Sequence, residues 1–201
     1  MEPFARLDAV AVPMATANVD TDQIIPARFL RKPRKAGYGQ YLFHDLRFDD
    51  AGNERPDFVL NQASYRGARV LIADRNFGCG SSREHAVYAL WDYGFRAAIA
   101  PSYGDIFYGN CLKNGFLPIV LPVDDAAALC DQVRQRPGAR VVVDLELQQV
   151  IAPDDRLLGF AIDGFRKHCL LAGIDELDFT LRHRADIESF ERDQGNATPW
   201  L

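Results

Sequence analysis

The sequence has no long apolar run. Its longest apolar stretch covers residues 116–123 and is interrupted by Pro118, whereas a membrane-spanning helix needs about 20 consecutive apolar residues. The first eight residues contain Glu2, Pro3 and Asp8, where a secretory signal peptide would carry an apolar core. These two absences predict a cytoplasmic chain that does not bind to a membrane.

The sequence also has no excess of basic residues. It contains 23 Lys and Arg against 28 Asp and Glu, which gives a formal net charge of −5. A nucleic-acid-binding protein or a peripheral membrane protein normally presents a positive field to its anionic partner. We therefore expect neither nucleic acid nor a membrane among the partners.

Cysteine and histidine are few and lack the spacings of metal ligands. No Cys-x-x-Cys pair and no His-Glu-x-x-His motif occurs, so a zinc ribbon, a dithiol and a compact iron–sulfur run are not predicted. A chain of 201 residues that is 48% hydrophobic has no need of a disulfide framework. We expect no metal site on this chain, and we expect at least three of the four cysteines to be buried thiols (Cys79, Cys111, Cys130, Cys169).

Short apolar runs alternate with amphipathic stretches, which is the pattern of an α/β domain with parallel strands. The expected parallel strands are 70–73, 97–100 and 116–121, and the helices between them are 82–93 and 105–113. A strand at 9–12, a helix at 124–136 capped by Asp124, antiparallel strands within 140–151 and a helix at 163–171 ended by Gly173 complete the pattern. We expect a single domain over residues 1–201, with a mobile loop at about 28–43 and a helical tail at about 186–201.

The segment that follows the expected strand 70–73 carries the densest chemistry. Gly78 and Gly80 permit a tight turn there, and Ser81 stands three residues before Glu84, which is the spacing of a helix capping box. With Ser81 as the N-cap, the first free backbone N–H groups of the helix would converge on one point and bind an anion.

Arg83 adds a planar guanidinium suited to a carboxylate. A nearby cation and helix N-terminus favour a serine alkoxide, so Ser81 is a candidate base toward a carbon acid that Arg83 holds. The alternative is that Ser81 and Ser82 only cap the helix. The turn is neither a G-x-G-x-x-G fingerprint nor a Walker loop nor a nucleophile elbow.

A second polar cluster lies near the start of the chain. Asp20 and Asp22 begin like a calcium loop, but Ile25 stands where that loop requires glycine. The two acids are therefore expected to orient Arg83, to contact a substrate hydroxyl, or to cap a turn.

The run from Asn76 to His85 resembles the signature of the swivelling domain of the aconitase superfamily. The resemblance is closest to the family of 3-isopropylmalate dehydratase small subunits, and it extends in order over most of the chain, through residues 20–26, 56–61, 92–95, 99–102, 105–110 and 163–169. It implies a swivelling β/β/α three-layer domain with a parallel βαβαβ core and an additional antiparallel sheet.

The resemblance also implies a function. Such a chain would act as a hydro-lyase with a separate large subunit, as a heterodimer or higher assembly, and would isomerise 2-isopropylmalate to 3-isopropylmalate through isopropylmaleate in leucine biosynthesis. A four-iron four-sulfur cluster would sit on the large subunit and no cofactor on this chain. Of the matched residues, Ser81 would remove the proton, Ser82, Arg83 and Gly80 would bind the dicarboxylate, and three acids would support them (Asp20, Asp22, Glu84).

Two other interpretations remain open from the sequence. The same scaffold could act on a related acid, of the citramalate/citraconate or homocitrate type, because by the resemblance residues 28–43 would determine the side group that is accepted. A non-catalytic anion-binding module built on the turn at 78–83 is the second alternative.

Overall fold

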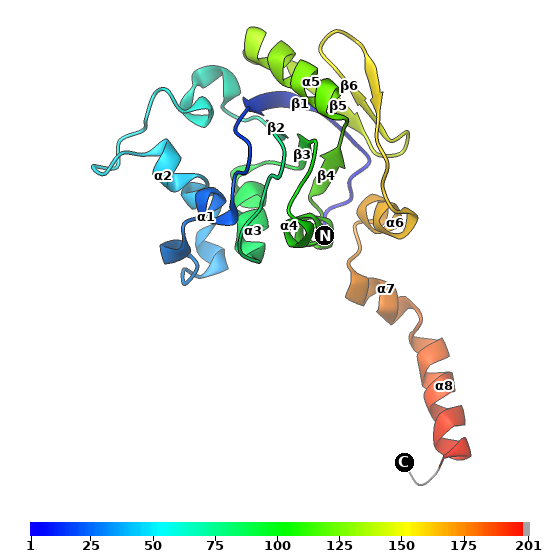
Figure 1. The fold of residues 1–201 in the computed structure, drawn as a ribbon. Helices are drawn as coiled ribbons and strands as arrows, with labels where there is room; N and C mark the ends of the chain where they lie inside the picture. Colours follow the sequence, from blue (N-terminus) through cyan, green and yellow to red (C-terminus); the bar gives the residue numbers. More distant parts are fainter. Residues whose placement is uncertain (199–201) are drawn as a thin grey trace.

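A seven-stranded sheet forms the centre of the computed structural model, which describes residues 1–198 (Figure 1). The strands lie in the order β4-β3-β2-β1-β5-β6-β7. Their bounds are β1 (Arg6–Met14), β2 (Val70–Ala73), β3 (Ala97–Ala100), β4 (Leu117–Val120), β5 (Arg140–Asp144), β6 (Gln149–Ile151) and β7 (Leu157–Gly159).

Strand β1 joins the two halves of this sheet. Its second half pairs in parallel with β2, with Ala11 opposite Val70, and its first half pairs antiparallel with β5, with Arg6 opposite Asp144. The parallel strands β1–β4 and the antiparallel strands β5–β7 are therefore continuous through one long strand. The α/β class with a parallel core and antiparallel strands, expected from the sequence, is confirmed.

Helices cover both faces of the parallel half (Figure 1). Helices α3 (Glu84–Tyr93) and α4 (Asp105–Lys113) lie on one face, and α5 (Val123–Gln135) crosses the other face from β4 back to β5. The connections β2-α3-β3 and β3-α4-β4 both join neighbouring parallel strands in the same direction across the sheet, and the usual handedness of such connections places α3 and α4 on the same face. Strands β2 and β3 are consequently buried at every residue.

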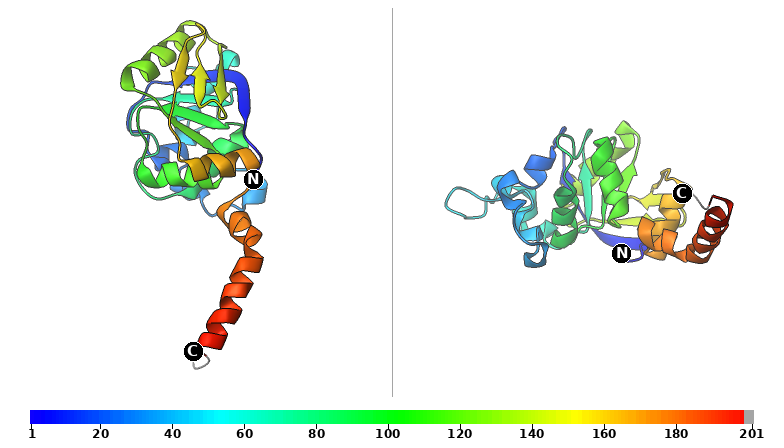
Figure 2. Two further views of the ribbon diagram at one scale, coloured as in Figure 1. Left: turned by 90° about the vertical axis from the view of Figure 1, so that its right-hand side faces the viewer. Right: turned by 90° about the horizontal axis from the view of Figure 1, so that it is seen from below.

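The remaining helices are short or lie at the carboxyl end of the chain. They are α1 (Thr21–Ile24), α2 (His44–Arg47), α6 (Gly164–Ala172), α7 (Glu176–Arg182) and α8 (Arg184–Ala197), with 3₁₀ turns at Ala27–Phe29, Arg34–Ala36, Gly39–Tyr41, Val59–Asn61 and Ala63–Tyr65. Helices α7 and α8 extend away from the rest of the chain (Figure 2). Residues 199–201 of the tail expected at about 186–201 lie outside the described residues. Within residues 1–198, no helix is long and apolar enough to cross a membrane.

Most element boundaries follow the sequence pattern, but the cap predicted for α5 is wrong. Asp163 caps α6 by accepting a hydrogen bond from the backbone N–H of Arg166 at 3.0 Å, and Gly173 ends that helix in the left-handed conformation. For α5, however, the N-cap is Pro122 and not Asp124, which lies inside the first turn. An acid in the first turn still interacts favourably with the helix dipole, so the position of Asp124 alone did not fix the boundary.

A buried tyrosine supports the loop that follows β3. The hydroxyl of Tyr103 lies 2.8 Å from the carbonyl oxygen of Ala98 and 3.0 Å from that of Ile119, so it donates toward two neighbouring strands. Burial raises the pKa of Tyr103 well above its ordinary value. Tyr103 also forms a backbone bridge with Phe77, in the loop that follows β2.

We expect Tyr103→Phe to lower the free energy of unfolding by about 1–2 kcal/mol, because buried carbonyl oxygens lose a donor. Urea denaturation measures the difference. Tyr41→Phe is the control, because no hydrogen bond of the Tyr41 hydroxyl is formed within the described residues. Equal effects of the two changes would show that the Tyr103 hydroxyl contributes nothing to stability.

Candidate active site

Three loops meet at the carboxyl ends of β1, β2 and β3. The backbone N–H of Gly78, after β2, donates to the carbonyl of Val19, after β1, at 2.8 Å. The N–H of Phe77 donates to the carbonyl of Ser102, after β3, at 3.1 Å. The glycine-rich loop after β2 is therefore hydrogen-bonded to the loop after β1 on one side and to the loop after β3 on the other.

Thr21 holds the part of this loop that carries the serines. Its side chain is 1% exposed, its backbone N–H donates to the carbonyl of Cys79 at 2.9 Å, and its hydroxyl donates to the carbonyl of Ser81 at 2.8 Å. The sequence analysis did not single out Thr21. Its one sequence signal is its place between Asp20 and Asp22.

Gly78 and Gly80 are both required by the backbone. Gly78 has φ +71°, and a Cβ atom there would lie 2.2 Å from Cγ of the Phe107 ring. Gly80 has φ +89°, and its Cβ would lie 3.3 Å from Cβ of Asp20. Left-handed backbone and close packing together exclude a side chain at Gly78.

The capping box predicted for Ser81 and Glu84 is wrong. Helix α3 begins at Glu84 with Arg83 as its N-cap, and no side chain caps it. Arg83 is extended, with φ −137° and ψ 105°. Glu84 instead accepts a hydrogen bond from Asn114 Nδ2 at 2.8 Å. The hydroxyl of Thr21 binds the carbonyl of Ser81, and the helix begins two residues after its predicted start at residue 82.

The two serines and Arg83 form an open surface. Ser81 and Ser82 are exposed, and among the described residues neither hydroxyl has a hydrogen-bond partner. The side chain of Arg83 is 18% exposed and forms an ion pair with Asp22. Of the alternatives for the two acids, Asp22 therefore orients Arg83. Asp20 caps a turn, because its carboxylate accepts from the N–H of residue 23 at 2.8 Å.

The basic segment between residues 28 and 43 contacts helix α3. The backbone N–H of Tyr38 donates to Asp92 Oδ2 at 2.8 Å, and the guanidinium of Arg34 lies 3.5 Å from the centre of the Tyr88 ring. At the other end Arg28 pairs with Asp45 and lowers the pKa of that carboxyl to about 2. Arg28, Arg34 and Tyr38 of this segment thus each contact a residue outside it.

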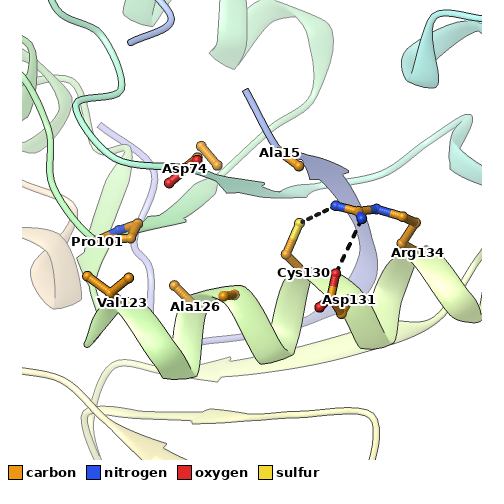
Figure 3. A pocket seen from close by; sticks show the side chains of 10 residues that line it. Ala15, Asp74, Pro101, Val123, Ala126, Cys130, Asp131 and Arg134 are labelled. Carbon is orange, nitrogen blue, oxygen red and sulfur yellow. Dashed lines mark hydrogen bonds and ion pairs between the residues drawn. The ribbon is translucent and has the colours of Figure 1, made fainter. Parts of the chain in front are cut away.

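The exposed serine surface is separate from the cavity on the α5 face. That cavity has a volume of about 120 Å³ and lies between α5 and the ends of β1, β2 and β3 (Figure 3). Asp74, Cys130 and Arg134 are among its lining residues, whereas Ser81 and Ser82 are not. This cavity is therefore not the candidate site.

Metal-ligating side chains are not clustered in the described part of the chain. Within residues 1–198, no three His, Cys, Asp or Glu side chains are placed to hold a metal ion. Cys111, Cys130 and Cys169 are buried, as expected, and Cys79 is half-buried. Burial raises the pKa of the Cys111 thiol well above its ordinary value.

Models of two protein families match this chain. The model of the aconitase C-terminal domain matches residues 1–124, and the LeuD_N model matches residues 127–164. The glycine-rich serine loop on a mixed α/β sheet thus defines a swivelling domain of the aconitase type.

Relatives of the same length are more specific. The chain is 49% identical to the 3-isopropylmalate dehydratase small subunit of Parvibaculum lavamentivorans over 100% of both chains. It is 51% identical to the one from Leptospira interrogans, over 100% of this chain and 98% of that one. A crystal structure of 3-isopropylmalate dehydratase from Methanocaldococcus jannaschii has a TM-score of 0.65 and 27% identity, over 92% of this chain and 99% of that chain. The chain belongs to the 3-isopropylmalate dehydratase small-subunit family, which confirms the resemblance found in the sequence.

Replacing Gly78 tests the close packing of the loop. We expect Gly78→Ala to lower the free energy of unfolding by about 2 kcal/mol or more, because a non-glycine residue is strained at this φ and a buried ring must move. Chemical denaturation measures it. Gly109→Ala is the control: that glycine lies inside α4, and an alanine Cβ there would have no other atom within 4 Å, so alanine should be neutral or stabilising. A loss no larger than that of the control would contradict the packing argument.

Proposed function

We propose that this chain is the catalytic small subunit of a 3-isopropylmalate dehydratase and that it supplies the proton-transfer half of the active site. The observation that carries the proposal is the placement of Ser81 beside Arg83 on an exposed surface. The loop backbone is fixed by Thr21, and Asp22 positions the guanidinium. The full-length similarity to small subunits of this dehydratase supports the choice of substrate.

In this proposal, different residues bind the substrate carboxylate and remove the proton. Arg83 binds one carboxylate of 2-isopropylmalate through its planar guanidinium, and Ser82 with the backbone of Gly80 completes the contacts to that carboxylate. Ser81, as an alkoxide favoured by the nearby cation, removes the proton from the carbon beside the carboxylate. Charge then develops on the carboxylate oxygens, where Arg83 stabilises it.

Reversal of these steps completes the isomerisation. Loss of the proton and of the hydroxyl group from 2-isopropylmalate leaves isopropylmaleate. Ser81 returns a proton when water adds across the double bond in the opposite sense, and the product is 3-isopropylmalate. Glu84 supports this surface indirectly, because its hydrogen bond to Asn114 ties the start of α3 to the end of α4.

The proposal includes a large subunit and its cofactor. A four-iron four-sulfur cluster on that subunit would supply the Lewis acid that accepts the leaving hydroxyl group. Because Ser81 and Ser82 are exposed, the large subunit must cover this surface and exclude water for the charged steps to be stabilised. We place the assembled enzyme in the cytoplasm, with leucine biosynthesis as its pathway.

Replacing Ser81 tests the proton-transfer role. We expect Ser81→Ala to lower kcat for 2-isopropylmalate by at least about 10²–10⁴-fold, which is the usual contribution of a positioned general base. The rate is measured anaerobically with this chain mixed with its cluster-bearing large subunit. Size-exclusion chromatography of the mixture is the control for assembly. Full activity of the variant, or loss of the complex in place of loss of turnover, would remove Ser81 from the chemistry.

Replacing Arg83 tests the carboxylate-binding role. Arg83→Lys keeps the positive charge and removes the planar pair of donors, so we expect KM for 2-isopropylmalate to rise by about 10-fold or more. Steady-state kinetics of the assembled complex gives KM and kcat separately. Arg140→Lys is the control, since Arg140 pairs with Asp8 at the opposite end of β1. Unchanged KM in Arg83→Lys would mean that another residue binds the carboxylate.

Faster turnover of a citramalate- or homocitrate-type acid than of isopropylmalate would overturn the choice of substrate.

A further inference from the structure

We propose that a cavity at the amino ends of β1, β2 and β3 binds a small oxyanion, phosphate or carboxylate, with Arg96 as its principal donor. The cavity has a volume of about 110 Å³. It lies at the opposite edge of the sheet from Ser81, because Arg6 opens β1 while Arg69 and Arg96 directly precede β2 and β3. All three arginines line it.

The charge of this cavity is opposite to that of the whole chain. Three guanidinium groups and one carboxylate, that of Glu2, line the cavity, although the chain has a net charge of −5. Arg6 has Asp144 as a partner at 3.8 Å. Arg69 forms no ion pair or side-chain hydrogen bond within the described residues. Two positive charges are thus left for a single acid.

Arg96 is held so that one edge of its guanidinium makes an ion pair with Glu2 but no hydrogen bond within the described residues. Its Nη1 donates to the carbonyls of Trp91 at 3.0 Å and Phe95 at 2.9 Å, and its guanidinium carbon lies 3.8 Å from the centre of the Trp91 ring. The Nε atom is buried and has no hydrogen-bond partner among the described residues. Burial lowers the pKa of Arg96, and the charge of Arg69 acts in the same direction.

That edge has the geometry of an oxyanion site. Arginine binds carboxylate and phosphate through two parallel N–H donors, and Nη1 of Arg96 is already occupied, which leaves Nε and Nη2. The nearest acid oxygen, Glu2 Oε2, is 3.6 Å from Nε, which is too long for a hydrogen bond. The Glu2 side chain is 69% exposed. Glu2 therefore marks the side from which an anion approaches and competes with it.

This site is independent of the proposed catalytic surface. Trp91 lies in the last turn of α3, whereas Arg83 precedes its first residue. A helix of 10 residues is about 15 Å long. Ser81→Ala should consequently leave anion binding unchanged, and removal of the cavity arginines should leave the catalytic loop intact.

The experiment uses Trp91 as the reporter. The chain contains two tryptophans, Trp91 and Trp200, so a Trp200→Phe background makes Trp91 the single fluorophore. The full chain is titrated with inorganic phosphate and, separately, with acetate as a simple carboxylate, and sodium chloride holds the ionic strength constant. We expect a saturable change in Trp91 fluorescence with at least one of the two anions. The anion that saturates at the lower concentration shows whether the site prefers phosphate or carboxylate.

Variants test the assignment of donors. Arg96→Gln should weaken binding at least 10-fold, Arg69→Gln should weaken it several-fold, and Arg140→Gln, a surface control, should leave it unchanged. Glu2→Gln should tighten binding, because it removes the competing charge without removing a donor. Isothermal titration calorimetry repeats each measurement without depending on Trp91, and circular dichroism checks that each variant is folded.

Three results would overturn the proposal. The first is a fluorescence change that does not saturate or that chloride reproduces. The second is equal binding by Arg96→Gln and Arg140→Gln. The third is that no free anion binds while Arg96→Gln weakens association with the large subunit, because the occupant would then be an acidic side chain of that subunit.

Discussion

Backbone hydrogen bonds among the three loops at the carboxyl ends of β1, β2 and β3 are the constraint on which the candidate site depends. The loop after β2 carries Ser81 and Arg83, yet its shape is determined from outside, by Val19 and Thr21 on one side and Ser102 on the other. Parallel strands bring their carboxyl ends to one edge of a sheet, so residues far apart in the sequence become neighbours there. The pairing of the strands thus brings the residues of the candidate site together.

The same arrangement explains why the surface is open. The glycines at 78 and 80 let the loop pack closely against Phe107 and Asp20, which turns the serine side chains outward. Arg83 alone is partly enclosed, because Asp22 holds its guanidinium. Within residues 1–198 this surface has one positioned cation and two exposed hydroxyls without a hydrogen-bond partner. This is the form expected of a subunit that completes its site with a partner.

The two edges of the parallel sheet have different electrostatic character. At the carboxyl edge Arg83 forms an ion pair with Asp22, whereas at the amino edge Arg96 pairs with the exposed Glu2 and Arg69 forms no ion pair within the described residues. Helix α3 links the two edges, with Arg83 at its start and Trp91 in its last turn. A ligand at either edge would thus contact the same rigid element without contacting the other site.

The periodicity of the sequence was sufficient to predict the strands of the parallel core and the helices between them. Buried strands such as 97–100 and amphipathic helices such as 105–113 show local patterns of apolar residues. The strand β7 and the helix α7 were not expected, since three residues with one buried position and a short exposed helix give weak patterns.

The sequence by itself determined the family and the candidate residues, because the motif from Asn76 to His85 is specific. Only the tertiary structure decided how these groups are held. Ser81 failed as a helix cap because Thr21, 60 positions away, binds its carbonyl. Asp22, not Asp20, became the partner of Arg83. Contacts between residues distant in the sequence arise from the pairing of strands, and local spacing contains no information about them.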